Sequence, residues 1–123
     1  MPAATFNFTK TGTRNAACEQ GATFSFSLTW KDSGGSAVNL TGYTARMKIK
    51  KDVEDTSAVL TLTTENGGIT LGGALGTIAL LATATQTGAL DAGNYVYDLE
   101  MVLSSTVTRL IEGNFQVTPQ VTT

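Results

Sequence analysis

The stretch TFSFSLTW, residues 23–30, alternates hydroxyl and apolar side chains without interruption. A period of two is the pattern of a β-strand that has one face in a core and the other face toward solvent. We therefore expect a strand here, with its four hydroxyl side chains pointing outward. Its inner face would carry Phe24, Phe26, Leu28 and Trp30.

The same period recurs along the chain. It predicts three further inward faces, made of Tyr43, Ala45, Met47 and Ile49, of Tyr95, Tyr97, Leu99 and Met101, and of Ile111, Phe115 and Val117. Shorter strands are expected at residues 5–9, 60–62, 69–71 and 77–81, and one helical turn at 82–90. Asn66-Gly67 suits the type I′ turn of a hairpin between the strands at 60–62 and 69–71, and Ser104-Ser105 predicts a tight turn before the last strand.

These strands are separated by Gly, Ser and Asn clusters and lack the crossover helices of βαβ units, which is typical of a β-sandwich. The sequence DAGNY at residues 91–95 has the spacing of a tyrosine corner, in which a Tyr hydroxyl bonds upstream backbone at the crossover between two sheets. The residues of this motif are Asp91, Gly93 and Tyr95. We therefore predict an all-β, immunoglobulin-like β-sandwich of seven to eight strands. No cysteine stands two residues after Tyr95, so the intersheet disulfide of antibody domains is not expected.

A chain of 123 residues is long enough for one domain with a core of its own. The sandwich is expected at residues 22–118, after an N-terminal arm and first strand at 1–21 and before a C-terminal tail at 119–123. Both ends are small, polar and threonine-rich, and such termini are usually loose unless docked. We therefore expect both ends to lie against neighbouring subunits. The predicted core residues are Phe24, Phe26, Leu28, Trp30, Met47, Ile49, Tyr97, Leu99 and Phe115.

The composition disfavours most catalytic chemistry. The chain has no histidine and one cysteine, so the usual proton shuttle near neutral pH and a cysteine-rich zinc site are missing. Eight basic and ten acidic residues give a net charge of −2, which disfavours a nucleic-acid or anionic-membrane surface. We expect no enzyme activity, no catalytic or metal-binding residues, no cofactor and no small-molecule substrate. No apolar run reaches the roughly 20 residues that span a bilayer, and the N-terminus lacks a secretory signal pattern, so synthesis in the cytosol is expected.

Several residue groups have both a chemical and a structural interpretation. The acidic residues within 52–55 could bind calcium, but they lack the spacing of a known loop, which favours a solvated loop. The glycines within 67–76 lack the lysine and the helix of a phosphate-binding loop and are expected to be bends. Cys18 has no histidine partner and is expected to be inert. Trp30 could stack on a sugar, but its place on an inward face favours core packing.

Two outward rows of charge have competing interpretations. Asp98 and Glu100 share a face, which is the minimum for the carboxylate pair of a glycosidase, although no other site residues accompany them. The basic row Arg46, Lys48 and Lys50, with Lys51, could meet phosphate, but it lacks the interleaved exposed aromatic residues that usually stack on nucleic acid. If the two strands that carry these rows are neighbours in a sheet, the basic row lies beside the acidic row and the opposite charges attract. We therefore expect ion pairs between the rows.

Six stretches carry a family resemblance: EQGATF (19–24), LTWKD (28–32), NLTGYTARM (39–47), TTENGGI (63–69), AGNYVYDL (92–99) and RLIEG (109–113). Together they resemble small tailed-phage and prophage proteins that are similar to the N-terminal domain of the phage baseplate upper protein. The resemblance covers about residues 18–119. It implies an immunoglobulin-like sandwich that serves as an attachment or structural module of a virion. No fibre, coiled coil or receptor-binding part follows in this sequence, so a receptor-binding role is not carried over.

We therefore expect a non-enzymatic structural component of a tailed-phage virion, in the tail, baseplate or fibre-attachment region, made in the bacterial host cytoplasm. A capsid decoration or cement protein is the alternative within structural roles. A carbohydrate-binding module for host recognition is the alternative from another class. The expected partners are other phage structural proteins and copies of the chain itself, and neither nucleic acid nor membrane.

Overall fold

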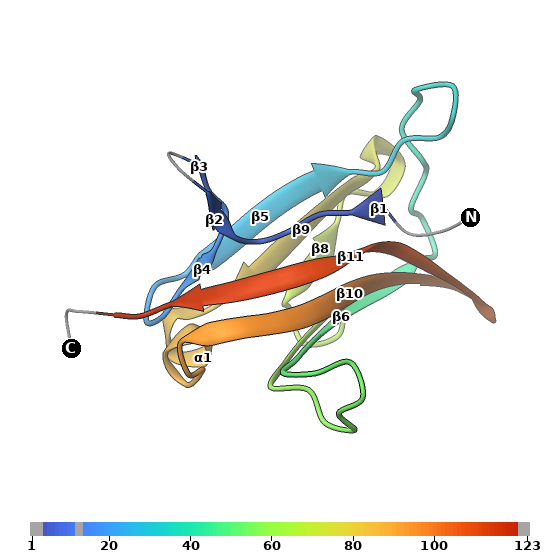
Figure 1. Cartoon of the computed structure of the whole chain (residues 1–123). Helices are drawn as coiled ribbons and strands as arrows, with labels where there is room; N and C mark the ends of the chain where they lie inside the picture. Colours follow the sequence, from blue (N-terminus) through green and yellow to red (C-terminus); the bar gives the residue numbers. More distant parts are fainter. Residues whose placement is uncertain (1–3, 12–13, 121–123) are drawn as a thin grey trace.

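The computed structural model describes residues 4–11 and 14–120, which form an all-β sandwich, as predicted (Figure 1). One sheet has the order β1-β11-β10-β6-β7, with β4 also paired to β11, and the other has the order β5-β9-β8. A small β2–β3 sheet projects beside them. The strands are β1 (Ala4–Thr5), β2 (Lys10–Thr11), β3 (Arg14–Asn15), β4 (Cys18–Glu19), β5 (Phe24–Thr29), β6 (Thr44–Lys50), β7 (Leu60–Thr63), β8 (Ile69–Leu71), β9 (Thr77–Ala82), β10 (Gly93–Leu103) and β11 (Thr106–Thr118). This exceeds the predicted seven to eight strands because residues 4–19 contribute four two-residue strands.

The larger sheet is built around β10, which pairs antiparallel with β6 on one side and β11 on the other. Every second residue of β10 from Tyr95 to Met101 is buried, because successive side chains of a strand point to opposite faces. The tight turn at Ser104-Ser105 is present, with Ser104 at a φ of 54°. The β10–β11 hairpin extends beyond the rest of the sheet (Figure 1).

The smaller sheet contains the strand expected at residues 23–30. Phe24 is buried, whereas Phe26, Leu28 and Trp30 are half-buried and pack against the core. Their partial exposure follows from the position of β5 at the edge of its sheet, where it pairs only with β9. The other predicted core residues, Met47, Ile49, Tyr97, Leu99 and Phe115, are all buried.

The predicted hairpin around Asn66-Gly67 is wrong. Strand β7 pairs with β6, and β8 pairs with β9, so the turn carries the chain from one sheet to the other. A type I′ turn needs positive φ at both central residues, but only Gly67 has it, at 82°. The Asn66 side-chain oxygen instead accepts hydrogen bonds from the backbone N–H groups of Thr63 and Gly68, at 2.9 and 2.8 Å.

The expectation of a separate N-terminal arm is also wrong for the described residues. Strands β1 and β4 both pair parallel with β11, and Phe8 forms a β-bridge with Phe115 between them. The sandwich therefore begins at Ala4 and not at residue 22. The β2–β3 hairpin is an excursion from this edge strand, closed by a hydrogen bond from the Ala16 N–H to the Thr9 carbonyl at 3.1 Å.

Gly113 allows the N-terminal segment to lie close against β11. A Cβ atom added there would overlap the Phe6 carbonyl oxygen and lie 2.7 Å from Asn7 Oδ1. Phe8, two residues after Phe6, is fully buried in a cluster of aromatic rings. At the other end, the Gln120 N–H donates to Gln20 Oε1 at 3.1 Å, so the described start of the C-terminal tail also contacts its own domain. Residues 1–3 and 121–123 lie outside the described residues.

The predicted helical turn is α1 (Ala84–Gly88), which begins with a capping box made by Thr83 and Gln86. Thr87 is fully buried, and its hydroxyl donates to the Ala22 carbonyl at 2.8 Å and accepts from the Gly21 N–H at 3.1 Å. These bonds fix the helix to the start of β5.

Candidate functional site

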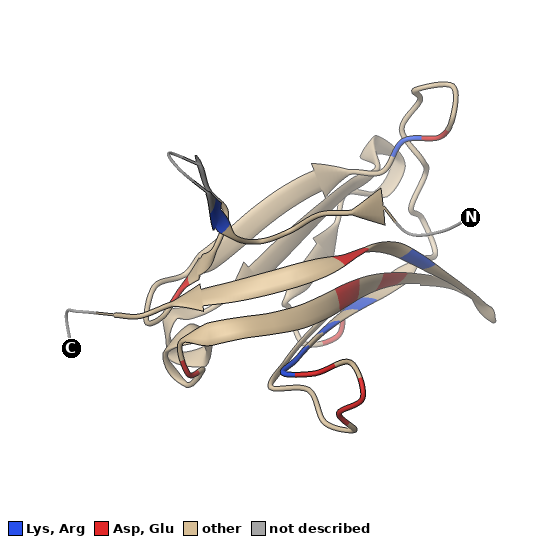
Figure 2. Ribbon diagram, in the orientation of Figure 1, with Lys and Arg blue, Asp and Glu red and all other residues tan. Residues whose placement is uncertain are grey.

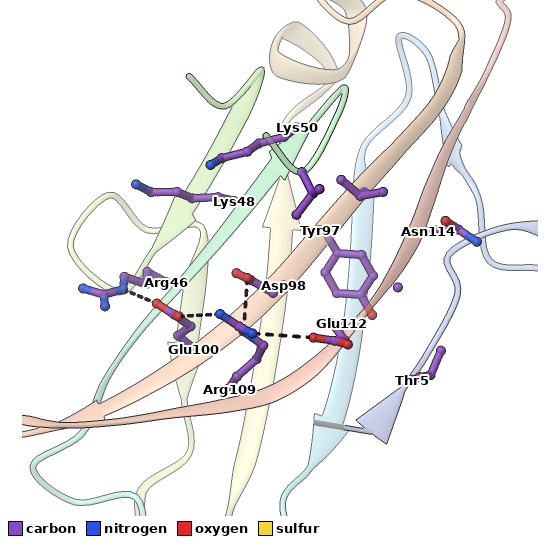
Figure 3. Close-up of a pocket in the computed structure, with 13 residues that line it drawn as sticks. Thr5, Arg46, Lys48, Lys50, Tyr97, Asp98, Glu100, Arg109, Glu112 and Asn114 are labelled. Carbon is purple, nitrogen blue, oxygen red and sulfur yellow. Dashed lines mark hydrogen bonds and ion pairs between the residues drawn. The ribbon is translucent and has the colours of Figure 1, made fainter. Parts of the chain in front are cut away.

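A shallow groove of about 790 Å³ lies on the outer face of the larger sheet, over β6, β10 and β11 (Figure 3). Its floor carries most of the charge of that face, and Figure 2 shows the blue and red segments on these strands. The strands place the side chains there because they alternate, with the apolar residues turned into the core. The charged lining residues are Arg46, Lys48, Lys50, Asp98, Glu100, Arg109 and Glu112.

The two predicted rows of charge are in register. Strand β6 pairs with β10 so that Lys48 stands opposite Asp98 and Arg46 opposite Glu100, which confirms the expected strand pairing. Arg46 Nε lies 2.8 Å from Glu100 Oε1. Lys48 makes no ion pair with any residue that the structure describes.

Arg109 is the central residue of the groove, and sequence reasoning missed it. Its guanidinium nitrogens lie 3.3 Å from Asp98, 3.8 Å from Glu100 and 3.9 Å from Glu112. The cause is a β-bulge, because the register jumps from the pair Leu99–Ile111 to the pair Glu100–Arg109 and leaves Leu110 as an extra residue. In a regular strand Arg109 and Glu112 would lie on opposite faces, and the bulge turns both outward.

Asp98 and Glu100 share Arg109, but burial has the larger effect on the pKa of Asp98. Burial and the negative charge of Glu100 raise the pKa of Asp98, although Arg109 opposes this shift. Asp98 and Glu100, considered above as a glycosidase pair, are both held by the same guanidinium. In this arrangement the two carboxylates neutralise a cation and fix the groove surface. Among residues 4–11 and 14–120, no group of three His, Cys, Asp or Glu residues is placed to hold a metal ion.

The other candidate groups have structural roles in their surroundings. The Asp52 N–H donates to Asp55 Oδ2 at 3.1 Å, so this acidic loop closes its own turn. Cys18 is fully buried, and burial together with the charge of Glu19 raises its pKa to about 11, which keeps the thiol protonated near neutral pH. Trp30 is half-buried and packs edge-on against Tyr43, with ring centroids 5.7 Å apart. Of the helices in the described part of the chain, none is long and apolar enough to cross a membrane.

Two tyrosine hydroxyls tie separate parts of the chain together. Tyr95 donates to the Asp91 carbonyl at 2.6 Å, which is the hydrogen bond of a tyrosine corner. Gly93, between them, has a φ of 153°, a conformation that residues with a side chain rarely adopt. Tyr97 donates to the Phe6 carbonyl at 2.5 Å and so connects β10 to the N-terminal segment. This second bond was not predicted, because nothing local in the sequence places Phe6 beside Tyr97.

The outer face of the smaller sheet contrasts with the groove. Strands β5, β8 and β9 contain no charged residue, and they are uniformly tan in Figure 2. Their outward side chains are hydroxyl or small and apolar, apart from Leu81, which is 42% exposed. The outward set is Ser25, Ser27, Thr29, Thr70, Thr77, Ala79 and Leu81. A hollow of about 340 Å³ lies beside the first half of β5, between that strand and the N-terminal segment.

The fold and these surfaces define an all-β sandwich domain. Comparison with known proteins adds no relative, since no family model matches the chain and no curated protein matches it either.

Proposed function

We propose that the protein is a non-enzymatic structural module of a tailed-phage particle, in its tail, baseplate or fibre-attachment region, and that it works by binding other proteins of that particle. The sequence resemblance described above points to the virion, with synthesis in the cytoplasm of the bacterial host. The surfaces of the domain supply the argument for an assembly role.

An immunoglobulin-like topology is part of this proposal, and the strand order supports it. In such sandwiches one sheet contains strands B, E and D and the other contains G, F and C with C′ beside it. Strands β5, β9 and β8 have the first order, and β11, β10, β6 and β7 have the second. The hydrogen bond from Tyr95 to Asp91 lies just before β10, the strand that corresponds to F.

The observation that carries the assembly role is the uncharged outer face of β5, β9 and β8. The cores of protein interfaces are depleted in charged residues, whereas exposed strands that stay unpaired usually carry them. On the other face of the molecule, Arg46 and Arg109 neutralise the carboxylates within the domain. The two faces therefore differ in what they offer to a partner, and the uncharged face is the one suited to be covered by protein.

The experiment is to locate the chain in purified particles and then to alter one face at a time. Density for the domain in a reconstruction of the particle, with cross-links to neighbouring proteins, is the expected result. Ala79→Lys adds a charge to the centre of the uncharged face and should lower incorporation, because a partner would have to bury that charge. Thr44→Lys adds the same charge to the exposed outer face of the larger sheet and is the control.

Both variants must first show the thermal unfolding of a folded domain. Absence of the chain from particles, or equal incorporation of the two variants, would contradict the proposal. Density on the capsid lattice would instead favour a decoration protein over a tail component.

A further inference from the structure

We propose that β5 pairs edge to edge with β5 of a second copy of this chain, about a two-fold axis at Ser27, so that two three-stranded sheets join into one. This inference rests on the proposed assembly role and names its first partner and the surface used. The argument starts from the backbone groups of β5 that have no partner within the domain.

The directions of these backbone groups follow from the register. The Trp30 N–H donates to the Gly76 carbonyl at 2.9 Å, which puts Trp30 in a hydrogen-bonded pair with the chain leading into β9. Hydrogen-bonded and non-bonded pairs alternate along an antiparallel ladder, so Phe24, Phe26 and Leu28 also bond β9. The N–H and C=O groups of the intervening residues, Ser25, Ser27 and Thr29, therefore point away from β9.

On that side, which we call the β5 edge, no described residue pairs with these three backbones. The edges of the larger sheet differ. Strands β1 and β4 cover the free side of β11, and on β7 the Asn66 side chain bonds the Thr61 carbonyl and the Thr63 N–H. Natural edge strands usually avoid association through charged residues, proline or bulges. Strand β5 is FSFSLT in a continuous register with β9 and has none of these features.

The loop that follows β5 leaves this edge open. The Trp30 carbonyl accepts from the Val38 N–H at 2.9 Å, and a Cβ at Gly76 would lie 3.0 Å from both the Trp30 and Val38 carbonyl oxygens. These contacts place the loop on the β9 side of the strand. At the other end of the edge, the hollow beside Phe24 and Ser25 separates β5 from the N-terminal segment.

A second copy fits this edge because the edge is complementary to itself. With an axis at Ser27, the Ser27 residues of the two copies face each other and Ser25 faces Thr29 of the second copy, which allows about six backbone hydrogen bonds. Hydroxyl side chains then lie opposite hydroxyl side chains on the outer face. On the inner face, Phe26 of each copy lies opposite Leu28 of the other, and the half-buried parts of both become covered.

Charge supports the same axis. In this register Thr23 of one copy stands opposite Lys31 of the other, and Glu19 lines the hollow together with Thr23. The arrangement therefore brings Glu19 of one copy toward Lys31 of the other, and the two-fold axis repeats this approach at the other end of the strand pair. No like charges meet at the axis, because β5 itself is uncharged. The joined sheets would also extend the uncharged outer face across both copies.

Disulfide trapping of the purified full-length chain tests the axis directly. Facing residues of a hydrogen-bonded pair have α-carbons about 5.5 Å apart, within the range of a disulfide. Ser27→Cys should therefore form a covalent dimer under mild oxidation. Thr29→Cys is the matched control, because its two copies would lie about 14 Å apart along the strand and should not cross-link with each other. Cys18 does not interfere, since it is buried.

Sedimentation measures the same association without a cross-link. The wild-type chain should show a concentration-dependent dimer, and Ser27→Lys should weaken it at least about tenfold because two ammonium groups would meet at the axis. Thr70→Lys adds the same charge on the exposed face of β8, away from the β5 edge, and should leave the dimer unchanged. Hydrogen exchange should show the Ser25, Ser27 and Thr29 amides protected in the dimer and unprotected in Ser27→Lys.

A wild-type chain that stays monomeric up to about 1 mM would overturn the inference, because a dimer with a millimolar Kd would be well populated at that concentration. Equal cross-linking of the two cysteine variants would overturn it as well. These outcomes are distinct from those of the particle experiment. A monomeric chain found in particles contradicts the β5 pairing alone, and a dimeric chain absent from particles contradicts the virion role alone.

Discussion

Replacement of Phe8 tests whether the N-terminal segment is part of the core. Phe8 has no exposed surface, although it belongs to a segment that the sequence assigns to an arm. It lies between the two sheets, next to the β1–β11 pairing. Its ring meets five others, with centroid distances of 4.9 Å to Phe6, 5.5 Å to Phe24, 4.9 Å to Phe26, 5.0 Å to Tyr97 and 5.8 Å to Phe115.

Truncation of a buried phenylalanine to alanine typically lowers the free energy of unfolding by about 3–5 kcal/mol, through lost burial and the cavity that remains. Domains of this size have a total stability of about 5–15 kcal/mol. The unfolding entropy expected for 123 residues converts each kcal/mol into about 4 °C of melting temperature. Phe8→Ala should therefore melt about 12–20 °C below the wild-type chain.

Urea unfolding followed by Trp30 fluorescence measures the loss, and an unchanged slope with denaturant shows that the same two states are compared. Phe26→Ala is the matched control, since it removes the same ring from a half-buried position and should destabilise less. A loss below about 1 kcal/mol for Phe8→Ala would refute this account of the core. So would a loss no larger than that of Phe26→Ala. Deletion of residues 1–9 removes β1 together with Phe8 and should destabilise the chain more than Phe8→Ala does in the same urea experiment.

Tyr95→Phe and Tyr97→Phe should each lower the free energy of unfolding by about 1–3 kcal/mol in urea, because each leaves a carbonyl without its donor; two negligible losses would contradict the roles of both hydroxyls. Arg46→Glu should lower the free energy of unfolding by only about 0.2–1 kcal/mol, since its ion pair with Glu100 is exposed. Adding Glu100→Arg should restore part of this loss but not all of it, because the new arginine at position 100 lies beside Arg109. The pKa of Asp98 is raised in the folded state, so the folded state binds this proton more tightly than the unfolded state does. The contribution of Asp98 to stability therefore falls as the pH rises from the unfolded-state pKa through the folded-state pKa. The stability of the wild-type chain relative to Asp98→Asn should therefore decrease across that pH window, and a constant difference would contradict the shift.

Features with a local signature were predicted from the sequence. Strands β5, β6 and β10 follow from strict alternation, because the two faces of a strand have different surroundings. The pairing of β6 with β10 was expected from the strand order of an immunoglobulin-like sheet, and the matching of their two rows of opposite charge followed from that pairing. The hydrogen bond between Tyr95 and Asp91 lies within five residues, so its spacing can be read from the chain.

Features that depend on distant segments could not be predicted in this way. The alternation at residues 5–9 predicted a strand, but nothing in it indicated a parallel partner more than one hundred residues away. Asn66-Gly67 marks a turn, yet a turn signal does not specify whether the chain stays in its sheet or changes sheets. The bulge at Leu110 has no glycine or proline beside it that would indicate it in the sequence, so the position of Arg109 in the groove could not be predicted.

The parallel pairing of the first and last strands also determines how the domain would carry tension. A pull on Ala4 and Gln120 draws the N-terminal segment and β11 in opposite directions along their common axis. The hydrogen bonds from Phe6 to Glu112 and from Phe8 to Asn114, at 3.0 and 2.9 Å, are then loaded together in shear, and they are not opened one after another as in a peeled hairpin. Forced unfolding depends on the barrier to breaking such contacts and not on overall stability. A module linked to its neighbours through its two ends would thus resist stretching through the same short strands that close its core.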